Sequence, residues 1–243
     1  MPRFFISSSA VSDGKALLVG DDAHHISRSL RMRVGESLVL CDGEGKDYFC
    51  TIDDISDREV LCTVDEVSES QSEPPYRATV YQGLAKGDRF DTVIQKSVEC
   101  GAYRIVPLMT KRCTVKLSPQ DYAKKCARWQ KIAEEAAKQS GRGIVPVVEE
   151  PISMDELIVR LKQTELPLFC YENGTFPIKE ALKKVSTPDH DSAIVIGPEG
   201  GFDEDEAAAA VSAGVIPVSL GKRILRTESA APFVLACLSL AFE

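Results

Sequence analysis

The amino-acid sequence predicts an α/β protein that combines a parallel sheet with a small N-terminal β-sheet domain. Residues 37–67 alternate apolar and polar side chains in short runs, a pattern typical of antiparallel strands. After residue 76, strand-like and helix-like segments alternate, which is typical of a parallel sheet covered by helices on both faces. The stretch Ser68–Pro75 is polar and ends in two prolines, as linkers often do. We therefore expect one domain at residues 1–72 and a second at residues 73–243.

The N-terminal domain is expected to hold one short helix and an antiparallel meander that forms a small β-barrel. The helix is expected at Asp21–Leu30, because acidic residues occupy its first turn. Turn-forming residues at Asp42–Gly45 and Ser56–Asp57 separate the strands of the meander. These strands are expected at Ser37–Cys41, Tyr48–Ile55 and Glu59–Val67.

The larger domain is expected to alternate strands with helices. Asp203 and Glu206 have the spacing of a capping box, and glycines are typical helix stops. The expected strands are Arg77–Gly83, Ile105–Met109, Leu166–Cys170, Ala193–Ile196 and Ile216–Leu220. The expected helices are Asp88–Cys100, a long one from Ser118 to Gly141, one from Asp203 to Gly214, and an apolar one at the C-terminus.

The charge of the chain gives two opposing indications about nucleic acid. The net charge of −8, taken alone, argues against nucleic-acid binding, because phosphates need cationic partners. Basic side chains nevertheless gather in three clusters, each of which is also compatible with a solvated face. The clusters are Arg28, Arg31 and Arg33; Lys111, Arg112 and Lys116; and Lys222, Arg223 and Arg226.

Neither a membrane span nor a metal site is expected. The sequence has no apolar run long enough to cross a bilayer, and Met1–Ile6 lacks the long apolar region of a secretory signal. The eight cysteines show no CxxC spacing, so we expect reduced thiols in a cytoplasmic protein. His24 and His25 are neighbours, and neighbouring helical side chains point about 100° apart, which makes a poor chelate.

Three loops follow predicted strands in the last third of the chain, at Tyr171–Gly174, Gly197–Gly201 and Gly221–Arg226. In open parallel sheets, ligands bind beyond the carboxyl ends of the strands. The string "IGPEGGF" at Ile196–Phe202 lacks the GxGxxG spacing, and no GxxxxGK[ST] occurs, so neither a dinucleotide site nor a P-loop is supported. Its glycines would let backbone groups approach a flat ligand such as an adenine ring, although a plain tight turn fits equally well.

The strings "IGPEGGF" and "LGKRILRTESA" resemble the 16S rRNA uracil-N3 methyltransferase family RsmE, a group of trefoil-knotted SPOUT methyltransferases. Upstream, "HHISRSLRMRVGE" is similar to the family's N-terminal arginine motif. The strings "KGDRFDTVIQKSVECGAYRIVPLMTKRC" and "RWQKIAEEAAKQSGRGIVPVV" are similar to its first βαβ unit and to its long helix with the strand that follows. Five motifs in the same order cover most of both expected domains.

The resemblance implies a fold, a reaction and partners. The N-terminal barrel would be PUA-like and would help to grip RNA, and the second domain would carry a trefoil knot. The enzyme would use S-adenosyl-L-methionine to methylate N3 of a uridine in 16S rRNA of the assembled small ribosomal subunit. It would act as a homodimer. Lys222 stands where the family often has proline, and Ser229 where it often has threonine. Pro232 lies early in the last helix, so the helix is expected to begin a few residues later here.

The resemblance also implies roles for individual residues. Arg226 would stabilise the negative charge that develops on the uracil oxygens. Glu228 is the first candidate for the general base and Glu199 the second, although Glu228 could instead stabilise a helix start and Glu199 could brace its loop. Cofactor contacts, largely through the backbone, fall on Tyr171, Glu172, Ile196, Gly197, Pro198, Gly200, Gly201, Leu220, Gly221, Ile224 and Leu225. RNA contacts fall on Arg28, Arg31 and Arg33, with Lys86, Lys111 and Arg112 as further candidates.

Three other functions remain open at this point. The chain could methylate a ribose 2′-hydroxyl of RNA, which leaves a base that pairs normally. It could be an RNA-binding ribosome-assembly factor without catalysis, which measured cofactor binding would distinguish. It could also modify a small molecule, although such a substrate does not need a separate arginine-bearing barrel. The sequence leaves open which uridine is modified and when in subunit assembly.

Overall fold

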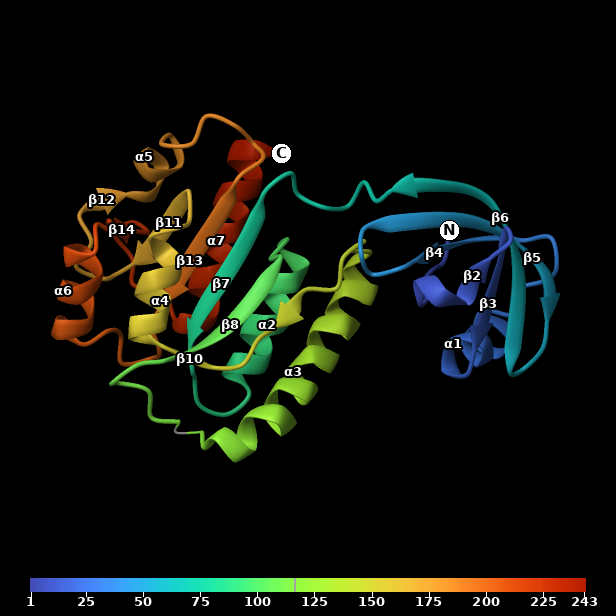
Figure 1. Ribbon diagram of the computed structural model, residues 1–243, viewed down its shortest axis with the longest axis horizontal. Helices are drawn as coiled ribbons and strands as arrows, with labels where there is room; N and C mark the ends of the chain where they lie inside the picture. The colour runs from blue at the N-terminus through green and yellow to red at the C-terminus, as the bar shows by residue number, and fades with distance from the viewer. Residues whose placement is uncertain (116) are drawn as a thin grey trace. The chain divides into compact units, whose positions relative to one another are not determined.

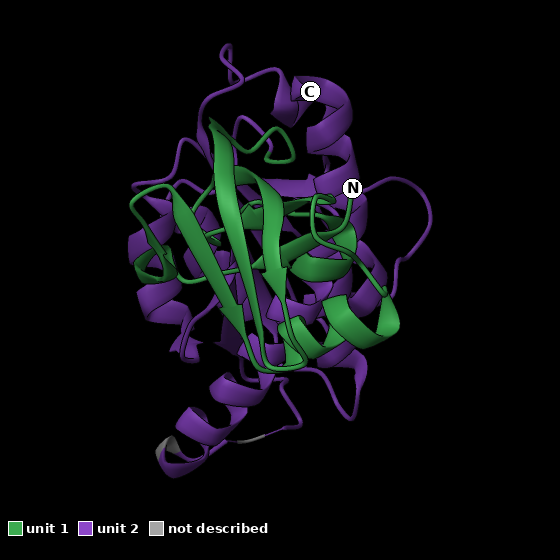
Figure 2. Cartoon of the chain, turned by 90° about the vertical axis from the view of Figure 1, so that its right-hand side faces the viewer, with its two compact units in different colours: residues 1–73, 137–145 green, residues 74–136, 146–243 purple. Residues whose placement is uncertain are grey.

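The computed structural model describes residues 1–115 and 117–243, so Lys116 of the second basic cluster lies outside the described residues. The chain forms two compact units (Figure 2). One consists of residues 1–73 and 137–145, and the other of residues 74–136 and 146–243. The first break lies beside the boundary expected from the linker composition. No pattern in the sequence predicts that residues 137–145 belong to the N-terminal unit.

The N-terminal unit is a curved mixed sheet around one apolar core. Strands β4, β5 and β6 pair antiparallel, which confirms the predicted meander, and β1 adds to β4 in parallel. Leu18, Leu40 and Ile52 are among the side chains that the sheet buries. The strand order is β1-β4-β5-β6-β3-β2, with β1 at Arg3–Phe5, β2 at Val11–Ser12, β3 at Lys15–Val19, β4 at Ser37–Cys41, β5 at Lys46–Ile55 and β6 at Glu59–Glu69.

Two short helical segments precede β4. A 3-10 turn, η1, covers Ser8–Ala10. The helix predicted at residues 21–30 is present, but it starts as one α-helical turn, α1 at Asp21–His24, and continues as a π-helical turn, η2 at His25–Ser29. The N–H of Leu30 donates to the carbonyl of His25 at 2.9 Å, which is the wider hydrogen bond of a π turn. Ile26 from this segment packs into the core.

Residues 137–145 are attached to the N-terminal unit by a buried ion pair. The carboxylate of Glu73 accepts hydrogen bonds from the Arg142 guanidinium, at 2.9 Å from Nε, and from the N–H groups of Gly143 and Ile144 at 2.7 and 3.0 Å. Arg142 is 4% exposed. A partly buried carboxylate needs such a set of donors to offset its desolvation.

The larger unit contains the predicted parallel sheet (Figure 1). Its order is β10-β8-β7-β13-β11-β14-β12, with β9 also paired to β8, and these pairs are parallel. The two-residue strand β9 lies in the stretch where the family resemblance implies a strand after the long helix, whereas β10 and β12 were not predicted. The strands are β7 at Arg77–Gly83, β8 at Arg104–Met109, β9 at Val147–Val148, β10 at Ile152–Ser153, β11 at Leu166–Cys170, β12 at Phe176–Pro177, β13 at Asp191–Ile196 and β14 at Pro217–Ser219.

Helices cover both faces of this sheet, as predicted. On one face, α4 and α6 pack their apolar side chains against Tyr81, Phe169 and Val195. On the other face, α7 contacts β7 and β13 and also packs against α2. The helices are α2 at Arg89–Glu99, α3 at Pro119–Ser140, α4 at Met154–Leu161, α5 at Ile178–Leu182, α6 at Glu204–Ser212 and α7 at Thr227–Phe242. The predicted capping box of Asp203 and Glu206 is present at the start of α6.

The last helix begins earlier than predicted. Helix α7 starts at Thr227 and contains Pro232, so the expectation of a later start is wrong. The proline lies in the second turn, where its missing N–H deprives only the carbonyl of Glu228 of a helical donor. The first turn still forms, because Ser229 and Ala230 donate to the carbonyl of Arg226 at 2.9 and 3.1 Å. Glu228 therefore lies within the first turn of this helix.

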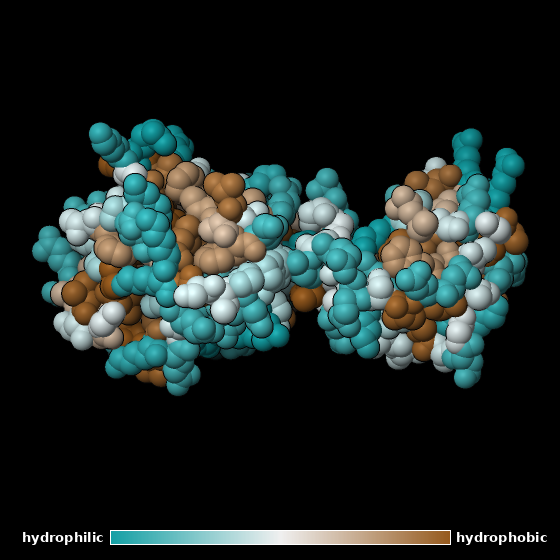
Figure 3. Space-filling model, turned by 90° about the horizontal axis from the view of Figure 1, so that it is seen from above, coloured by the Kyte–Doolittle hydropathy of each residue, from teal (hydrophilic) through white to brown (hydrophobic). Residues whose placement is uncertain are grey.

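Hydrophilic and hydrophobic side chains are interspersed on the face of each unit that Figure 3 shows. Among the helices of the described residues, none is long and apolar enough to span a membrane. The trefoil knot that the family resemblance implies stays a prediction.

Candidate active site

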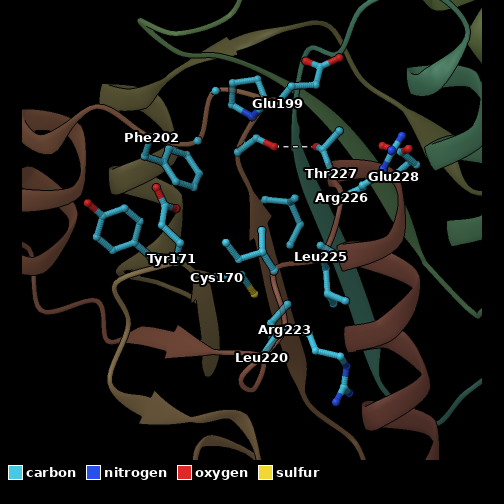
Figure 4. A pocket seen from close by; sticks show the side chains of 18 of the residues that line it. Cys170, Tyr171, Glu199, Phe202, Leu220, Arg223, Leu225, Arg226, Thr227 and Glu228 are labelled. Atoms are coloured by element: carbon cyan, nitrogen blue, oxygen red, sulfur yellow. Dashed lines mark hydrogen bonds between the residues drawn. The ribbon is translucent and has the colours of Figure 1, made fainter.

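The carboxyl ends of β11, β13 and β14 border a cavity of about 730 Å³ (Figure 4). The parallel register sets Cys170 beside Ile196 on one side and beside Val218 on the other, so the three strands end together. Each of the three loops that the sequence singled out contributes to the lining. The cavity therefore lies where a ligand site is expected in a parallel sheet.

The structure brings the predicted cofactor and catalytic residues together at this cavity. Its lining includes the candidates for catalysis, Arg226, Glu228 and Glu199. It also includes each candidate for cofactor contact, namely Tyr171, Glu172, Ile196, Gly197, Pro198, Gly200, Gly201, Leu220, Gly221, Ile224 and Leu225. Their roles stay predictions, but they share one site.

The glycine-rich loop is shaped by close approaches that side chains would block. The N–H of Gly201 donates to the carbonyl of Pro198 at 2.9 Å and closes a tight turn. Gly201 has φ of +68°, and a Cβ there would lie 2.8 Å from a carboxylate oxygen of Glu172. A Cβ on Gly83, at the end of β7, would lie 2.3 Å from the nitrogen of Pro198. Gly83 leaves no room for a side chain, and the positive φ of Gly201 would strain any other residue. Gly83 was not among the residues predicted from the sequence.

Glu199 is held by donors from outside its loop. Its carboxylate accepts from the N–H of Lys86 at 3.0 Å and from the guanidinium of Arg89 at 2.6 Å. Burial of the carboxyl favours a higher pKa. The hydrogen bonds from its own N–H, from Lys86 and from Arg89 outweigh burial, so the pKa of Glu199 lies below its ordinary value. These contacts favour the bracing role for Glu199 over proton transfer.

Arg226 and Glu228 flank the start of α7. Arg226 occupies the N-cap position in extended conformation, with its side chain exposed, and Glu228 lies half-buried in the first turn. Figure 4 shows both side chains on the same side of the cavity. A cation and a carboxylate are thus presented to one region of the site.

Sequence reasoning missed several lining residues. Phe202 packs at the base of the glycine-rich loop, with its ring 4.5 Å from that of Phe169. Thr227 is buried between Arg226 and Glu228, and its hydroxyl bonds the carbonyl of Gly197 at 2.7 Å. Phe202 ends the string that drew attention to the loop. Thr227 lies within the string "LGKRILRTESA", in which no role was predicted for it.

Several predicted RNA-binding cations are paired within the protein. Arg28 forms an ion pair with Asp57. Lys111 pairs with Asp203 at 3.0 Å and with Asp205 at 2.8 Å. Arg112 donates to the carbonyl of Gly200 at 3.1 Å. These three cations therefore stabilise the protein's own carboxylates and loop carbonyl.

Other cations have no such partner. The side chains of Arg31, Arg33 and Lys86, and of the cavity residues Lys222 and Arg223, form no hydrogen bond or ion pair with residues 1–115 and 117–243. Arg31 also has φ of +53°, in the left-handed region. The unpartnered cations nearest the cavity are thus in the Gly221–Arg226 loop, which the sequence analysis named as a cluster without assigning it to RNA.

Two further observations concern a cysteine of the cavity and the arrangement of possible metal ligands. Cys170 lines the cavity, and burial, with a smaller effect of Cys237, raises the pKa of its thiol to about 12. A thiol in this state is a poor nucleophile at neutral pH. Within residues 1–115 and 117–243, no group of three or more His, Cys, Asp and Glu side chains has the arrangement of a metal site.

Comparison with known proteins agrees with this geometry. Residues 72–239 match the family model of an RNA methyltransferase domain, and residues 18–65 match that of an RNA methyltransferase PUA domain. The chain is 33% identical to ribosomal RNA small subunit methyltransferase E of Bacillus subtilis, over 100% of this chain and 98% of the relative. It is 32% identical to the protein of the same name from Synechocystis, over 99% of this chain and 78% of the relative.

Solved structures show the same relationship. The chain superimposes with a TM-score of 0.85 on ribosomal RNA small subunit methyltransferase E of Neisseria gonorrhoeae bound to S-adenosyl methionine, at 32% identity over 99% of this chain and 97% of that one. A methyltransferase of Legionella pneumophila in complex with the same cofactor gives a TM-score of 0.82 at 32% identity, over 98% of this chain and 97% of that one. The resemblance seen in the sequence motifs is confirmed, and the chain belongs to the ribosomal RNA small subunit methyltransferase E family.

Proposed function

We propose that this chain transfers the methyl group of S-adenosyl-L-methionine to N3 of a uridine in 16S rRNA of the small ribosomal subunit. One observation carries the proposal. The cavity at the carboxyl ends of β11, β13 and β14 gathers a glycine-rich loop, a cation and a carboxylate in a chain of this family. Two similar structures are described with the same cofactor bound, which supports its assignment here.

The residues present fit this cofactor. A volume of about 730 Å³ is within the range of ligand pockets. A Cβ on Gly197 would lie 3.2 Å from the backbone of Gly201 and from the Phe202 ring, so a side chain there would need its neighbours to shift, and the glycine presents backbone groups instead. The cofactor carries a sulfonium and no phosphate, which suits a loop that has a glutamate and no lysine. Ile196, Leu220 and Leu225 would contribute apolar walls.

The chain's own groups would prepare the uracil. When bound, S-adenosyl-L-methionine supplies an electrophilic methyl group. N3 of uracil is a poor nucleophile until its proton leaves, and negative charge then spreads onto O2 and O4. The guanidinium of Arg226 would stabilise that charge, a role worth about 10²–10³-fold in rate for one well-placed donor. Glu228 would accept the proton, and general-base help is worth roughly 10²–10⁴-fold.

Methylation at nitrogen fits the site better than methylation at a pyrimidine carbon through a covalent thiolate. The carbon reaction needs a cysteine thiolate to add to the ring, and the thiol of Cys170 has a pKa raised to about 12 by burial. The contacts of Glu199 favour Glu228 as the base. Methylation of a ribose 2′-hydroxyl remains the second candidate, since the same cation and carboxylate could activate a hydroxyl.

The N-terminal unit is proposed to help grip the RNA. Its match to a PUA domain supports this role, and Arg31 and Arg33 are exposed and free to meet phosphates. Such contacts position RNA without reading its sequence. We further propose that the protein acts as a homodimer in the cytoplasm, where ribosomal subunits are assembled.

The proposal is tested by methyl transfer from labelled S-adenosyl-L-methionine. The protein is incubated with small subunits from cells that lack the enzyme and, in parallel, with naked 16S rRNA. Label in the assembled subunits and little in naked rRNA is expected. Label in neither RNA, together with cofactor binding measured by titration, would indicate another substrate. Absence of cofactor binding as well would support an RNA-binding assembly factor.

A further inference from the structure

A buried chain of hydrogen bonds joins three segments that are far apart in sequence. Gln82 is the penultimate residue of β7, Gly197 belongs to the glycine-rich loop after β13, and Thr227 is the first residue of α7. The amide Nε2 of Gln82 donates to the hydroxyl of Thr227 at 2.8 Å. That hydroxyl donates to the carbonyl of Gly197 at 2.7 Å, and this second bond is the dashed line in Figure 4. Gln82 is 0% exposed and Thr227 is 8% exposed.

The direction of each bond in this chain is fixed. The carbonyl oxygen of Gly197 can only accept, so the single proton of the Thr227 hydroxyl points to it. The lone pairs of that hydroxyl then accept from Gln82, whose Nε2 also donates to the carbonyl of Gly83 at 3.1 Å. A flipped amide would turn its oxygen towards these carbonyls. The arrangement therefore has one orientation.

The arrangement also carries a cost. The Oε1 atom of Gln82 is buried without a hydrogen-bond partner among residues 1–115 and 117–243. Unsatisfied buried acceptors are uncommon and usually have a specific reason. An apolar side chain would fill this position in the sheet without that cost, so packing alone does not explain a glutamine. The hydrogen bond that the glutamine amide donates to Thr227 explains it.

The two ends of the chain of bonds lie in different parts of the site. Gly197 belongs to the loop proposed to receive the cofactor. Thr227 lies between Arg226 and Glu228, which the proposed reaction uses, and the carbonyl of Arg226 accepts from Ser229 at 2.9 Å in the same turn. A displacement of the loop carbonyl would therefore move the start of α7.

We propose that Thr227, held by Gln82, is a positioning residue that couples the cofactor loop to Arg226 and Glu228. The inference rests on the proposed methyl transfer. It adds that the loop conformation that receives the cofactor and the positions of the reacting side chains change together, because a single hydroxyl joins them. Positioning of this kind affects the rate strongly, because a shift of about 1 Å in a reacting group can lower the rate about 100-fold.

The test compares variants that differ by one polar group. Thr227→Val replaces the hydroxyl with a methyl group of similar volume, and Thr227→Ser retains the hydroxyl. Gln82→Leu removes the donor. Ser97→Ala is the matched control, because Ser97 in α2 is also fully buried and its hydroxyl has no partner among the described residues. The readouts are kcat at saturating cofactor, KM and titrated affinity for S-adenosyl-L-methionine, and the midpoint of thermal unfolding.

We expect Thr227→Val to weaken cofactor affinity and also to lower kcat, with kcat/KM reduced about 10- to 100-fold. Thr227→Ser should stay within about threefold of the wild type. Gln82→Leu should also weaken cofactor affinity and lower kcat. In the double variant with Thr227→Val, Gln82→Leu should reduce kcat/KM by less than it does alone, since both substitutions remove the same hydrogen-bond network. A loss confined to KM would reflect only a displaced loop and would overturn the coupling.

The inference is also overturned if Thr227→Val matches the wild type, or if Ser97→Ala loses as much activity. If Thr227→Val does not fold, Gln82→Leu is compared with Ser97→Ala. The inference is then overturned if the two variants lose the same activity. A wild-type protein that binds the cofactor but methylates no RNA would contradict the proposed function. In that case equal cofactor affinities of the wild type and Thr227→Val would still overturn the coupling.

Discussion

The guanidinium of Arg89 lies 2.6 Å from the carboxylate of Glu199 and ties the glycine-rich loop to the start of α2. The N–H of Lys86 donates to the same carboxylate at 3.0 Å. The loop that borders the cavity is therefore braced from the neighbouring strand–helix connection. A carboxylate engaged in this way is a weak base, because its donors stabilise the charged form.

This brace gives a prediction about pH. The pKa of Glu199 is lowered in the folded protein, since the hydrogen bonds outweigh burial. A group of this kind stabilises the fold above its unfolded pKa and loses that contribution as pH falls through its folded pKa. The contacts of Glu199 with Lys86 and Arg89 should thus contribute the same stability at neutral and alkaline pH and lose it only in acid.

The corresponding variant is Glu199→Gln, which keeps an oxygen acceptor for Lys86 and Arg89. We expect its kcat/KM to fall by no more than about 10-fold, as for a weakened hydrogen bond, with the pH–rate profile unchanged in shape. Loss of a limb of that profile in Glu199→Gln would instead identify Glu199 as the base. The measurement is kcat/KM for methyl transfer across neutral and alkaline pH.

Glu228 should behave differently. Glu228→Gln is expected to lower kcat by roughly 10²–10⁴-fold with cofactor affinity unchanged, because it removes the proposed general base. The rate of this variant should recover partly as pH rises and N3 loses its proton without help.

The control for Glu228 is Glu204→Gln, which changes a carboxylate in the first turn of α6. Both substitutions weaken interaction with a helix N-terminus, worth about 0.3–1 kcal/mol of stability, but only one would touch the reaction. Equal rates for the two variants would leave Glu228 with the helix-stabilising role alone.

Gly201 should be essential for cofactor affinity. Gly201→Ala places a Cβ at φ of +68° and 2.8 Å from Glu172. Gly214→Ala is the control, because Gly214 has φ of +87° with open space around it. Each should lose about 1–2 kcal/mol of stability from backbone strain, seen as a lower unfolding midpoint. Only Gly201→Ala should weaken titrated binding of S-adenosyl-L-methionine, and equal affinities in the two variants would contradict the placement of the cofactor against this loop.

The unpartnered cations beside the cavity should contribute to RNA binding. The double variant Lys222→Ala/Arg223→Ala is expected to weaken binding to small subunits and to make its salt dependence shallower, because fewer counterions are released. Lys162→Ala/Lys179→Ala removes the same charge from exposed positions outside this cavity. If both double variants show the same loss of affinity and the same change in salt dependence, net charge accounts for the effect and the loop has no special role.

Much of the fold could be predicted because its strands are short buried runs between clear turn signals. Arg77–Gly83 and Leu166–Cys170 were predicted with the bounds that the structure gives. Ile152–Ser153 and Phe176–Pro177 are too short to show a period, so they were missed. The attachment of residues 137–145 to the N-terminal unit depends on the contact of Arg142 with Glu73, a long-range pairing that local patterns do not show.

The site was predicted in part for a similar reason. Loops at the carboxyl ends of parallel strands must meet at one edge, so the three loops could be named from the strand order. The bond between Gln82 and Thr227 joins positions 145 residues apart. Thr227 lies within the string "LGKRILRTESA", but no local pattern pairs it with Gln82. Likewise, only the structure separates Lys111, paired with Asp203, from Lys222, which has no partner among the described residues.

The most direct test of the central claim is to map the methylated nucleotide by reverse transcription across 16S rRNA from labelled small subunits. Methylation at N3 removes a Watson–Crick donor, so the polymerase should stop strongly at one uridine. The stop and the label should both disappear with Arg226→Ala, while that variant still binds the cofactor. Label without a stop, in a nucleoside that still pairs normally, would contradict N3 methylation and favour transfer to a ribose hydroxyl.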